Sequence, residues 1–216
     1  MMGSNLRRFF LAIVLIAACA GAVRADGMND LDTFIRTVKS GRADFTQVVT
    51  IPARDGQAAR LKTSSGSFEF SRPGRFKFIY KKPFAQTIVA DGQTLWMWDV
   101  ELNQVTARKQ SAVLGSTPAA LIASTSDLHV LEIDFVLTAE GERDGMEWVQ
   151  AMPKAKDSSL QNVRVGFRGA ELMSLEILDS FGQKSALKFG NVQSNVALEA
   201  ATFAFKPPPG ADVIRQ

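Results

Sequence analysis

The chain has 216 residues, of which 46% are hydrophobic and 22% charged, so it is long enough to bury the core of one domain. It carries 25 basic and 22 acidic side chains. One histidine and one cysteine are too few for a disulfide framework or for a zinc site built from these residues.

Residues 1–25 have the organisation of a secretory signal peptide. Two arginines form a basic start, and the apolar run at 9–18 is too short to span a bilayer. Small side chains lie one and three residues before the bond that follows Ala25. We therefore predict export with cleavage after Ala25, and a single domain over residues 26–216.

Removal of this leader changes the charge balance. Arg7, Arg8 and Arg24 leave with it, so the predicted mature chain carries 22 basic and 22 acidic residues. The basic isoelectric point is then largely a property of the leader and gives no argument for nucleic-acid binding. No later stretch reaches roughly 18 consecutive apolar residues, so we expect no spanning segment in the mature protein.

A second interpretation of the leader is open. Ile16-Ala17-Ala18-Cys19 resembles a lipobox, in which the cysteine becomes a lipidated N-terminus, although Ile stands where Leu is usual. Cleavage after Ala25 would instead remove Cys19 and leave the mature chain without cysteine.

The first predicted element after the leader is an amphipathic helix at 28–40. Leu31, Ile35 and Val38 have helical spacing, and Gly41 is suited to end the helix. Its apolar stripe is expected to pack on the core.

Strands dominate the next part of the chain. Residues 43–52 are rich in β-branched side chains and predict a first strand, and residues 61–70 predict a second after a polar loop. The stretch 66–109, which begins within this second strand, is interpreted as five short strands. They are separated by turns at 72–74, 82–83, 91–92 and 99–103.

Aromatic side chains in this stretch occur two residues apart, which places the members of each set on one face of a strand. Ordinary burial in a core explains such a pattern. A barrel or half-barrel whose concave face binds lipid or acyl chains also explains it. The sets are Phe68 and Phe70; Phe76, Phe78 and Tyr80; and Trp96 and Trp98.

A small, apolar segment without charge until its last residue spans 110–127. Ser116 or Thr117 can cap a helix there, and Pro118 suits its first turn, so we predict a short helix that continues to Ala123. A helix this short is marginal in water and has to be held by packing. It can therefore detach at modest cost, as a movable lid requires.

Short alternating strands resume at Ile133, with a turn at Asp144-Gly145, and predict an antiparallel sheet that is strongly curved or closed. We expect one helical turn at 198–201, a last strand at 203–205 and the end of regular structure at 207–210. The apolar strand positions are Ile133, Phe135 and Leu137; Met146 and Trp148; Val163, Val165 and Phe167; Met173, Leu175 and Ile177; and Leu187 and Phe189.

The chain lacks the motifs of common enzyme classes. It has no P-loop, no dinucleotide-binding glycine fingerprint and no pair of cysteines. The single histidine, His129, has neither metal ligands at suitable spacing nor a serine in a nucleophile-elbow context, so we expect it in a loop or at a strand edge. We therefore predict a protein that is not an enzyme and uses no metal or other cofactor.

Six short motifs follow one another along nearly the whole predicted mature chain. They are Asp44-Phe45-Thr46-Gln47, Phe70-Ser71-Arg72-Pro73-Gly74-Arg75-Phe76, Ala90-Asp91-Gly92-Gln93-Thr94-Leu95-Trp96, Leu102-Asn103-Gln104-Val105-Thr106, Thr117-Pro118 to Leu121-Ile122, and Phe203-Ala204-Phe205-Lys206-Pro207-Pro208. Each motif is weak alone, but in this order they resemble the LolA family, periplasmic carriers of lipoproteins to the outer membrane.

The resemblance implies a mainly β protein with a few helices: an incomplete, unclosed antiparallel β-barrel covered by a short α-helical lid. Its apolar interior would take the acyl chains of lipoproteins. In the family, an arginine at the position of Arg72 acts as a latch by bonding to backbone carbonyls of the lid helices. The residues at cavity positions are Phe76, Phe78, Ile88 and Trp96, and those at lid positions are Pro118, Leu121 and Ile122.

The resemblance also implies partners and a compartment. The protein would be a periplasmic monomer that collects lipoproteins from the inner-membrane transporter LolCDE and delivers them to the outer-membrane acceptor LolB. Two alternatives remain open at this point. One is a lipidated acceptor of the same fold, similar to LolB, which Cys19 supports; the other is a structural β-protein with a solid core and no cavity.

Overall fold

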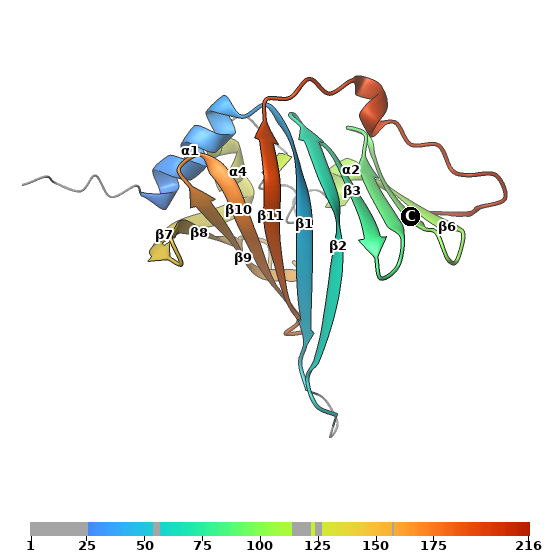
Figure 1. Cartoon of the computed structure of the whole chain (residues 1–216), viewed down its shortest axis with the longest axis horizontal. Coiled ribbons are helices and arrows are strands. Elements are labelled where there is room, and N and C mark those ends of the chain that lie inside the picture. The colour runs from blue at the N-terminus through green and yellow to red at the C-terminus, as the bar shows by residue number, and fades with distance from the viewer. Residues whose placement is uncertain (1–25, 54–56, 114–121, 124–126, 157) are drawn as a thin grey trace, which may run out of the picture.

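The computed structural model describes residues 26–53, 57–113, 122–123, 127–156 and 158–216, and twelve strands of this part form one sheet (Figure 1). The helices are α1 (Gly27–Thr37), α2 (Gln110–Val113), α4 (Leu128–Asp134) and the 3-10 helix η2 (Ala200–Phe203). The strands are β1 (Ser40–Ile51), β2 (Arg60–Ser71), β3 (Arg75–Lys82), β4 (Gln86–Ala90), β5 (Thr94–Asp99), β6 (Gln104–Lys109), β7 (Phe135–Arg143), β8 (Met146–Pro153), β9 (Leu160–Arg168), β10 (Glu171–Asp179), β11 (Lys184–Ser194) and β12 (Asp212–Arg215).

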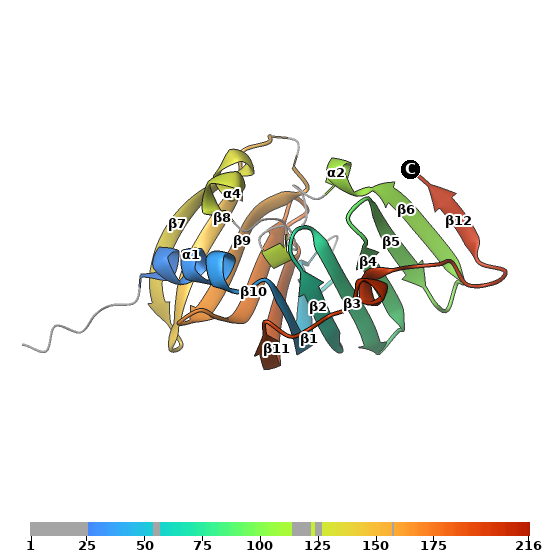
Figure 2. The ribbon, with the colours of Figure 1, turned by 90° about the horizontal axis from the view of Figure 1, so that it is seen from above.

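The strand order is β12-β6-β5-β4-β3-β2-β1-β11-β10-β9-β8-β7. All neighbours are antiparallel except β12 and β6, which are parallel. The order is linear, with β7 and β12 at its edges, so the sheet curves strongly without closing (Figure 2). With α1 and α4 packed against one half of the sheet, this confirms the predicted class of a mainly β, unclosed barrel with a few helices.

Helix α1 forms where the apolar spacing predicted it. The Asp26 side chain caps it by accepting a hydrogen bond from the Met28 amide at 3.1 Å. The helix ends at Thr37, three residues before the predicted end, and Gly41 lies within β1. The early end has a tertiary cause, because the Lys39 amide donates to the Asn195 side chain at 2.8 Å. No helix in the described part of the chain is long and apolar enough to cross a membrane.

The five strands predicted in 66–109 are all present, with the predicted turns between them. Gly74 and Gly92 have φ values of +70° and +103°, a region that suits glycine because it has no Cβ. In this half of the molecule, turn chemistry and alternation were sufficient to place the elements.

Helix α4 was not predicted. The Asp127 side chain caps it by accepting from the His129 amide at 2.9 Å, and Leu131 is its buried residue. Ile133 therefore belongs to a helix and is 70% exposed, so its assignment to a strand was wrong. His129 lies on the same helix rather than in a loop or at a strand edge.

The C-terminal region also differs from the prediction. Residues 200–203 form η2, so the strand predicted at 203–205 was wrong, and the helical turn lies slightly later than expected. Regular structure also continues beyond the prolines. Strand β12 pairs with the open edge of β6, where the Asp212 amide donates to the Asn103 carbonyl at 3.0 Å. This pairing is between segments far apart in the sequence, which a local pattern does not reveal.

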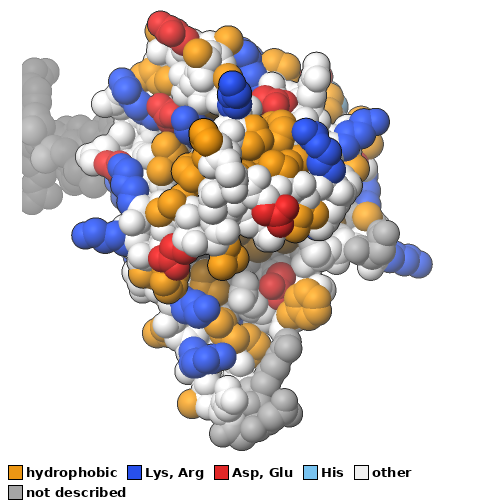
Figure 3. All heavy atoms as spheres, turned by 90° about the vertical axis from the view of Figure 1, so that its right-hand side faces the viewer, with side chains coloured by type: hydrophobic (Ala, Val, Ile, Leu, Met, Phe, Trp, Pro, Cys, Tyr) orange, Lys and Arg blue, Asp and Glu red, His pale blue; other side chains and the backbone are white. Residues whose placement is uncertain are grey.

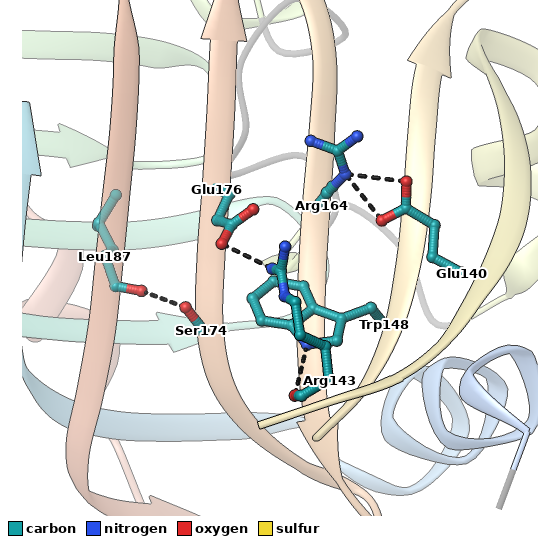
Figure 4. Close-up of polar contacts among 7 residues, drawn as sticks. All are labelled: Glu140, Arg143, Trp148, Arg164, Ser174, Glu176 and Leu187. Carbon is teal, nitrogen blue, oxygen red and sulfur yellow. Dashed lines mark hydrogen bonds and ion pairs between the residues drawn. The ribbon is translucent and has the colours of Figure 1, made fainter. Parts of the chain in front are cut away.

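Charged side chains lie on the convex side of β7–β10 (Figure 4). Arg143 pairs with Glu176 at 2.7 Å, and Arg164 pairs with Glu140 at 2.7 Å. The Arg143 guanidinium lies 4.1 Å from the ring centre of Trp148, which is 2% exposed. Exposed ion pairs of this kind contribute little individually, so the cover over Trp148 depends mainly on packing.

Candidate functional site

The concave side of the sheet carries a continuous surface of aromatic rings, here called the concave aromatic face. The Phe68 ring centre lies 4.4 Å from that of Phe78, and the Phe45 ring centre lies 5.0 Å from that of Tyr80. Phe34 of α1 reaches the same surface, 6.1 Å from Phe70. The members of this face are Phe45, Phe68, Phe70, Phe76, Phe78 and Tyr80.

Three of the four predicted cavity residues share this face. The strand register pairs Phe78 with Ile88, and Phe76 with Ala90, so their side chains point to the same side. Ile88 is partly buried and packs against the core that these phenylalanines form. Burial of Tyr80 raises the pKa of its hydroxyl to about 12, which keeps the phenol neutral at physiological pH.

Trp96 lies on the opposite, convex side, so its prediction as a neighbour of Phe76 and Phe78 was wrong. The register pairs Trp96 with Val89, which alternates with the inward residues of β4. Its ring centre is 5.5 Å from that of Phe205, and its indole nitrogen donates to Asp91 at 2.8 Å. The inward positions on β5 include Leu95 and Met97, which pair with Ala90 and Ile88. Both faces of this strand are apolar, so alternation alone does not choose between them.

Arg72 lies at one end of the concave aromatic face, in the turn between β2 and β3, and is 8% exposed. Its Nη1 donates to the Val38 carbonyl at 2.8 Å, at the C-terminal end of α1. The guanidinium also lies 4.7 Å from the ring centre of Phe34 and 5.3 Å from that of Phe70. Burial lowers the pKa of Arg72 to about 10, so it stays charged near pH 7 and fastens α1 to the aromatic rings.

The turn that contains Arg72 also contacts the segment predicted as a lid. Ile122 and Ala123 are 1% and 0% exposed, and the Gly74 amide donates to the Ala123 carbonyl at 2.6 Å. The predicted lid residues Pro118 and Leu121 lie outside the described residues. The position of Ile122 and Ala123 is consistent with a segment that covers the aromatic rings.

Gln110 is a structural residue of this site that the sequence analysis missed. Its amide nitrogen donates to the Gly74 carbonyl at 2.6 Å, and its amide oxygen accepts from the Gly92 amide at 2.9 Å. One side chain thus joins the turn beside Arg72 to the turn between β4 and β5. The only signal in the sequence was a long polar side chain at the start of a small apolar segment.

The described residues contain no group of three or more His, Cys, Asp or Glu side chains placed to hold a metal ion. The concave aromatic face offers apolar surface, an arginine at one end and a buried covering segment. An open sheet wrapped around such a surface defines a class of mainly β half-barrel proteins with an apolar interior.

Comparison with known proteins identifies the family. Residues 36–206 match the family described as outer membrane lipoprotein carrier protein LolA. A protein of Albidiferax ferrireducens named outer-membrane lipoprotein carrier protein is 63% identical over 211 residues, covering 96% of this chain and 99% of that protein. One of the same name from Leptothrix cholodnii is 51% identical over 208 residues, covering 96% and 94%. The chain therefore belongs to the LolA family.

Solved structures show the same fold at low sequence identity. An uncharacterized conserved protein from Thermus thermophilus superposes with a TM-score of 0.50 at 13% identity, covering 88% of this chain and 97% of that chain. At that identity, the similarity concerns the fold alone.

Proposed function

We propose that this protein is a periplasmic carrier that holds the acyl chains of lipoproteins against the concave aromatic face. The observation that carries the proposal is its similarity, over 96% of its length, to proteins named outer-membrane lipoprotein carrier protein. Phe76, Phe78 and Ile88 would contact the acyl chains, since they lie on one apolar surface. The function involves binding and transfer, without a catalytic step.

Reversible transfer limits how much of each acyl chain is buried. Burial contributes about 0.8 kcal/mol per CH₂, so one fully buried chain of ~16 carbons gives on the order of 12 kcal/mol. Three such chains would exceed the practical limit of roughly 20 kcal/mol for noncovalent binding. A carrier that releases its cargo therefore needs partial burial, or an opposing free energy from contacts that close the empty site.

The segment at 118–123 would supply this opposing free energy by acting as a lid. Pro118, Leu121 and Ile122 would contact the apolar interior when the lid is closed. Arg72 would act as the latch at its edge. The observation that supports this role of Arg72 is the Gly74–Ala123 hydrogen bond, which joins the turn that contains Arg72 to this segment. Opening for cargo would break such contacts, and release of cargo would restore them.

The proposal is tested with purified mature protein and a triacylated lipoprotein, using the unlipidated form of the same cargo as control. Binding of the lipidated form alone is expected. If both forms bound equally, or neither bound, the acyl-chain carrier would be excluded.

Arg72→Leu tests the latch. A charged hydrogen bond from Arg72 to the closed lid would contribute about 1.5–3 kcal/mol to the closed state. The variant should therefore bind cargo roughly ten- to a hundredfold more tightly and transfer it to an acceptor more slowly. Arg75→Leu is the matched control, because Arg75 contacts the Phe203 ring on the convex side. Wild-type binding and transfer by Arg72→Leu would disprove the latch.

The cargo would come from the inner-membrane transporter LolCDE and pass to the outer-membrane acceptor LolB. Export with cleavage after Ala25 would leave Asp26 as an unmodified N-terminus. Mass spectrometry of the protein purified from cells distinguishes this from a LolB-like acceptor, which would begin at an acylated Cys19.

A further inference from the structure

The concave side changes character along its strands. Toward Arg72 it is aromatic, but at the other end of the same strands the inward positions become polar. Gln47 follows Phe45 by two residues on β1 and pairs with Ser64 on β2. Gln86 precedes Ile88 by two residues on β4 and pairs with both Tyr80 and Asp99. Since side chains alternate along a strand, these polar groups lie on the same side as the phenylalanines.

These residues line a pocket of about 490 Å³ between the β3–β4 and β5–β6 turns, here called the polar portal. Its volume lies within the usual range of ligand pockets. It presents two side-chain amides, two hydroxyls and two carboxylates, from Gln47, Gln86, Ser64, Tyr80, Asp99 and Glu101. Figure 3, which views the molecule from this side, shows a hollow with hydrophobic side chains in it and acidic side chains nearby.

The polar portal adjoins the concave aromatic face through one side chain. Tyr80 lines the portal, and its ring centre lies 5.0 Å from that of Phe45 and 6.4 Å from that of Phe78. At the outer rim, Phe84 and Leu102 are 63% and 71% exposed. The two turns are joined directly, since the Val100 amide donates to the Ala85 carbonyl at 3.2 Å. The portal is therefore a built pocket with an apolar side and a polar side.

The opposite end of the concave aromatic face is covered by α1, by the buried Arg72 and by Ile122 and Ala123. A ligand whose acyl part lies on the phenylalanines and whose polar part stays in contact with water would thus direct its polar part toward the portal. Gln86 and Gln47 are half-buried, and the Gln47 amide nitrogen donates to the Ser185 hydroxyl at 2.5 Å, which leaves its amide oxygen facing the portal. Side-chain amides at this depth can hydrogen-bond a polypeptide backbone.

We propose that the polar portal binds the polypeptide segment directly attached to the lipid-bearing residue of the cargo. This inference rests on the proposed function, because it presumes that acyl chains occupy the aromatic face. Gln86 and the amide oxygen of Gln47 would hydrogen-bond the peptide backbone, and Phe84 and Leu102 would cover the segment where it leaves the protein. The carrier would then recognise a lipopeptide rather than a free lipid.

The test compares two synthetic ligands: a triacylated cysteine amide, and the same group extended by a short, polar, uncharged peptide. Wild-type protein should bind the lipopeptide more tightly than the lipid alone. Gln86→Leu should weaken lipopeptide binding by about three- to tenfold and leave lipid binding unchanged. A factor of this size corresponds to the net free energy of one or two hydrogen bonds. Gln93→Leu is the control, because Gln93 lies in the exposed turn at the other end of β4 and β5.

Equal affinity of the wild-type protein for lipid and lipopeptide would overturn this inference and leave the proposed function standing. Failure of both the lipid and the lipopeptide to bind would overturn the proposed function and the inference with it. A second measurement does not depend on a variant. A photoreactive residue placed next to the lipidated cysteine of the peptide should crosslink to residues 84–86 or 99–102. Crosslinks only to α1 or to the 91–93 turn would contradict the portal.

Discussion

Aromatic side chains lie on both faces of β3–β5, but the two faces are covered in different ways. On the concave side, rings from β1, β2 and β3 contact one another and Phe34 of α1. On the convex side, Trp96 and Trp98 are covered by one segment, whose Phe205 ring centre lies 5.5 and 6.5 Å from theirs. That segment is anchored to the sheet by η2 on one side and β12 on the other.

The concave rings therefore form an interior surface, whereas the convex rings form an exterior surface that one segment of the chain covers. The concave aromatic face is shared by many elements and reaches Ile122 and Ala123, which belong to the proposed lid. The convex aromatic residues are covered by the chain's own C-terminal segment, and the Lys77 ammonium donates to the Thr202 carbonyl at 3.3 Å. Aromatic residues spaced by two therefore indicate burial on both sides, and only the concave side carries the acyl-chain site that we propose.

The largest effect is expected from Phe68→Ala on the concave side. Phe68 is 1% exposed and lies 4.4, 5.7 and 5.8 Å from the ring centres of Phe78, Phe70 and Phe189. Its loss should lower the free energy of unfolding in urea by about 3–5 kcal/mol. Trp98→Ala, at a half-buried position, should lower it by less. Equal losses would show that the two faces are packed alike.

Gln110→Leu should have the next largest effect, because it leaves the Gly74 carbonyl and the Gly92 amide without their partner. We expect a loss of about 2–4 kcal/mol in the free energy of unfolding. Gln110→Glu keeps the acceptor for Gly92 but places a carboxylate oxygen against the Gly74 carbonyl in a buried site, so it should be destabilised as well. A wild-type melting temperature for Gln110→Leu would show that the bridge between the two turns is dispensable.

Phe205→Ala should uncover the convex cluster at a cost of about 1–2 kcal/mol in stability. Tryptophan emission should shift to the red as Trp96 and Trp98 gain contact with water, while acyl-chain binding stays unchanged. Phe205→Leu serves as a control that keeps most of the apolar cover. Loss of acyl-chain binding in the alanine variant would contradict the assignment of the two faces.

The smallest effect concerns Asp91. Burial alone would raise the pKa of its carboxyl, but hydrogen bonds from the Thr94 amide, the Trp96 indole and the Gln93 amide lower it below 3.8. A lowered pKa in the folded state stabilises the protein above about pH 3.8, and this stabilisation is lost as the pH falls through the lowered value. An NMR titration of Trp96→Phe should place the Asp91 pKa higher than in wild type, whereas an unchanged value would exclude the indole as a cause.

Local patterns were reliable where each element depends on its own residues. Helix α1, the strands within 66–109 and their turns follow from apolar spacing and from glycine and proline positions. The same reasoning missed α4, which is short and has one buried residue, Leu131. The cavity positions came from the family resemblance: the strand register places Phe76, Phe78 and Ile88 on one side of the sheet and Trp96 on the other.

By itself, the sequence determined the alternation of strands, the mainly β class, the membership in a carrier family and the presence of excess aromatic surface. These follow from periodicity, turn residues and ordered motifs, which are local properties. Only the tertiary structure decided which aromatic side chains face inward, that Arg72 bonds to the end of α1, and that β12 pairs with the edge of β6. Each of these depends on register or on contacts between segments distant in the chain, which packing of the whole sheet selects.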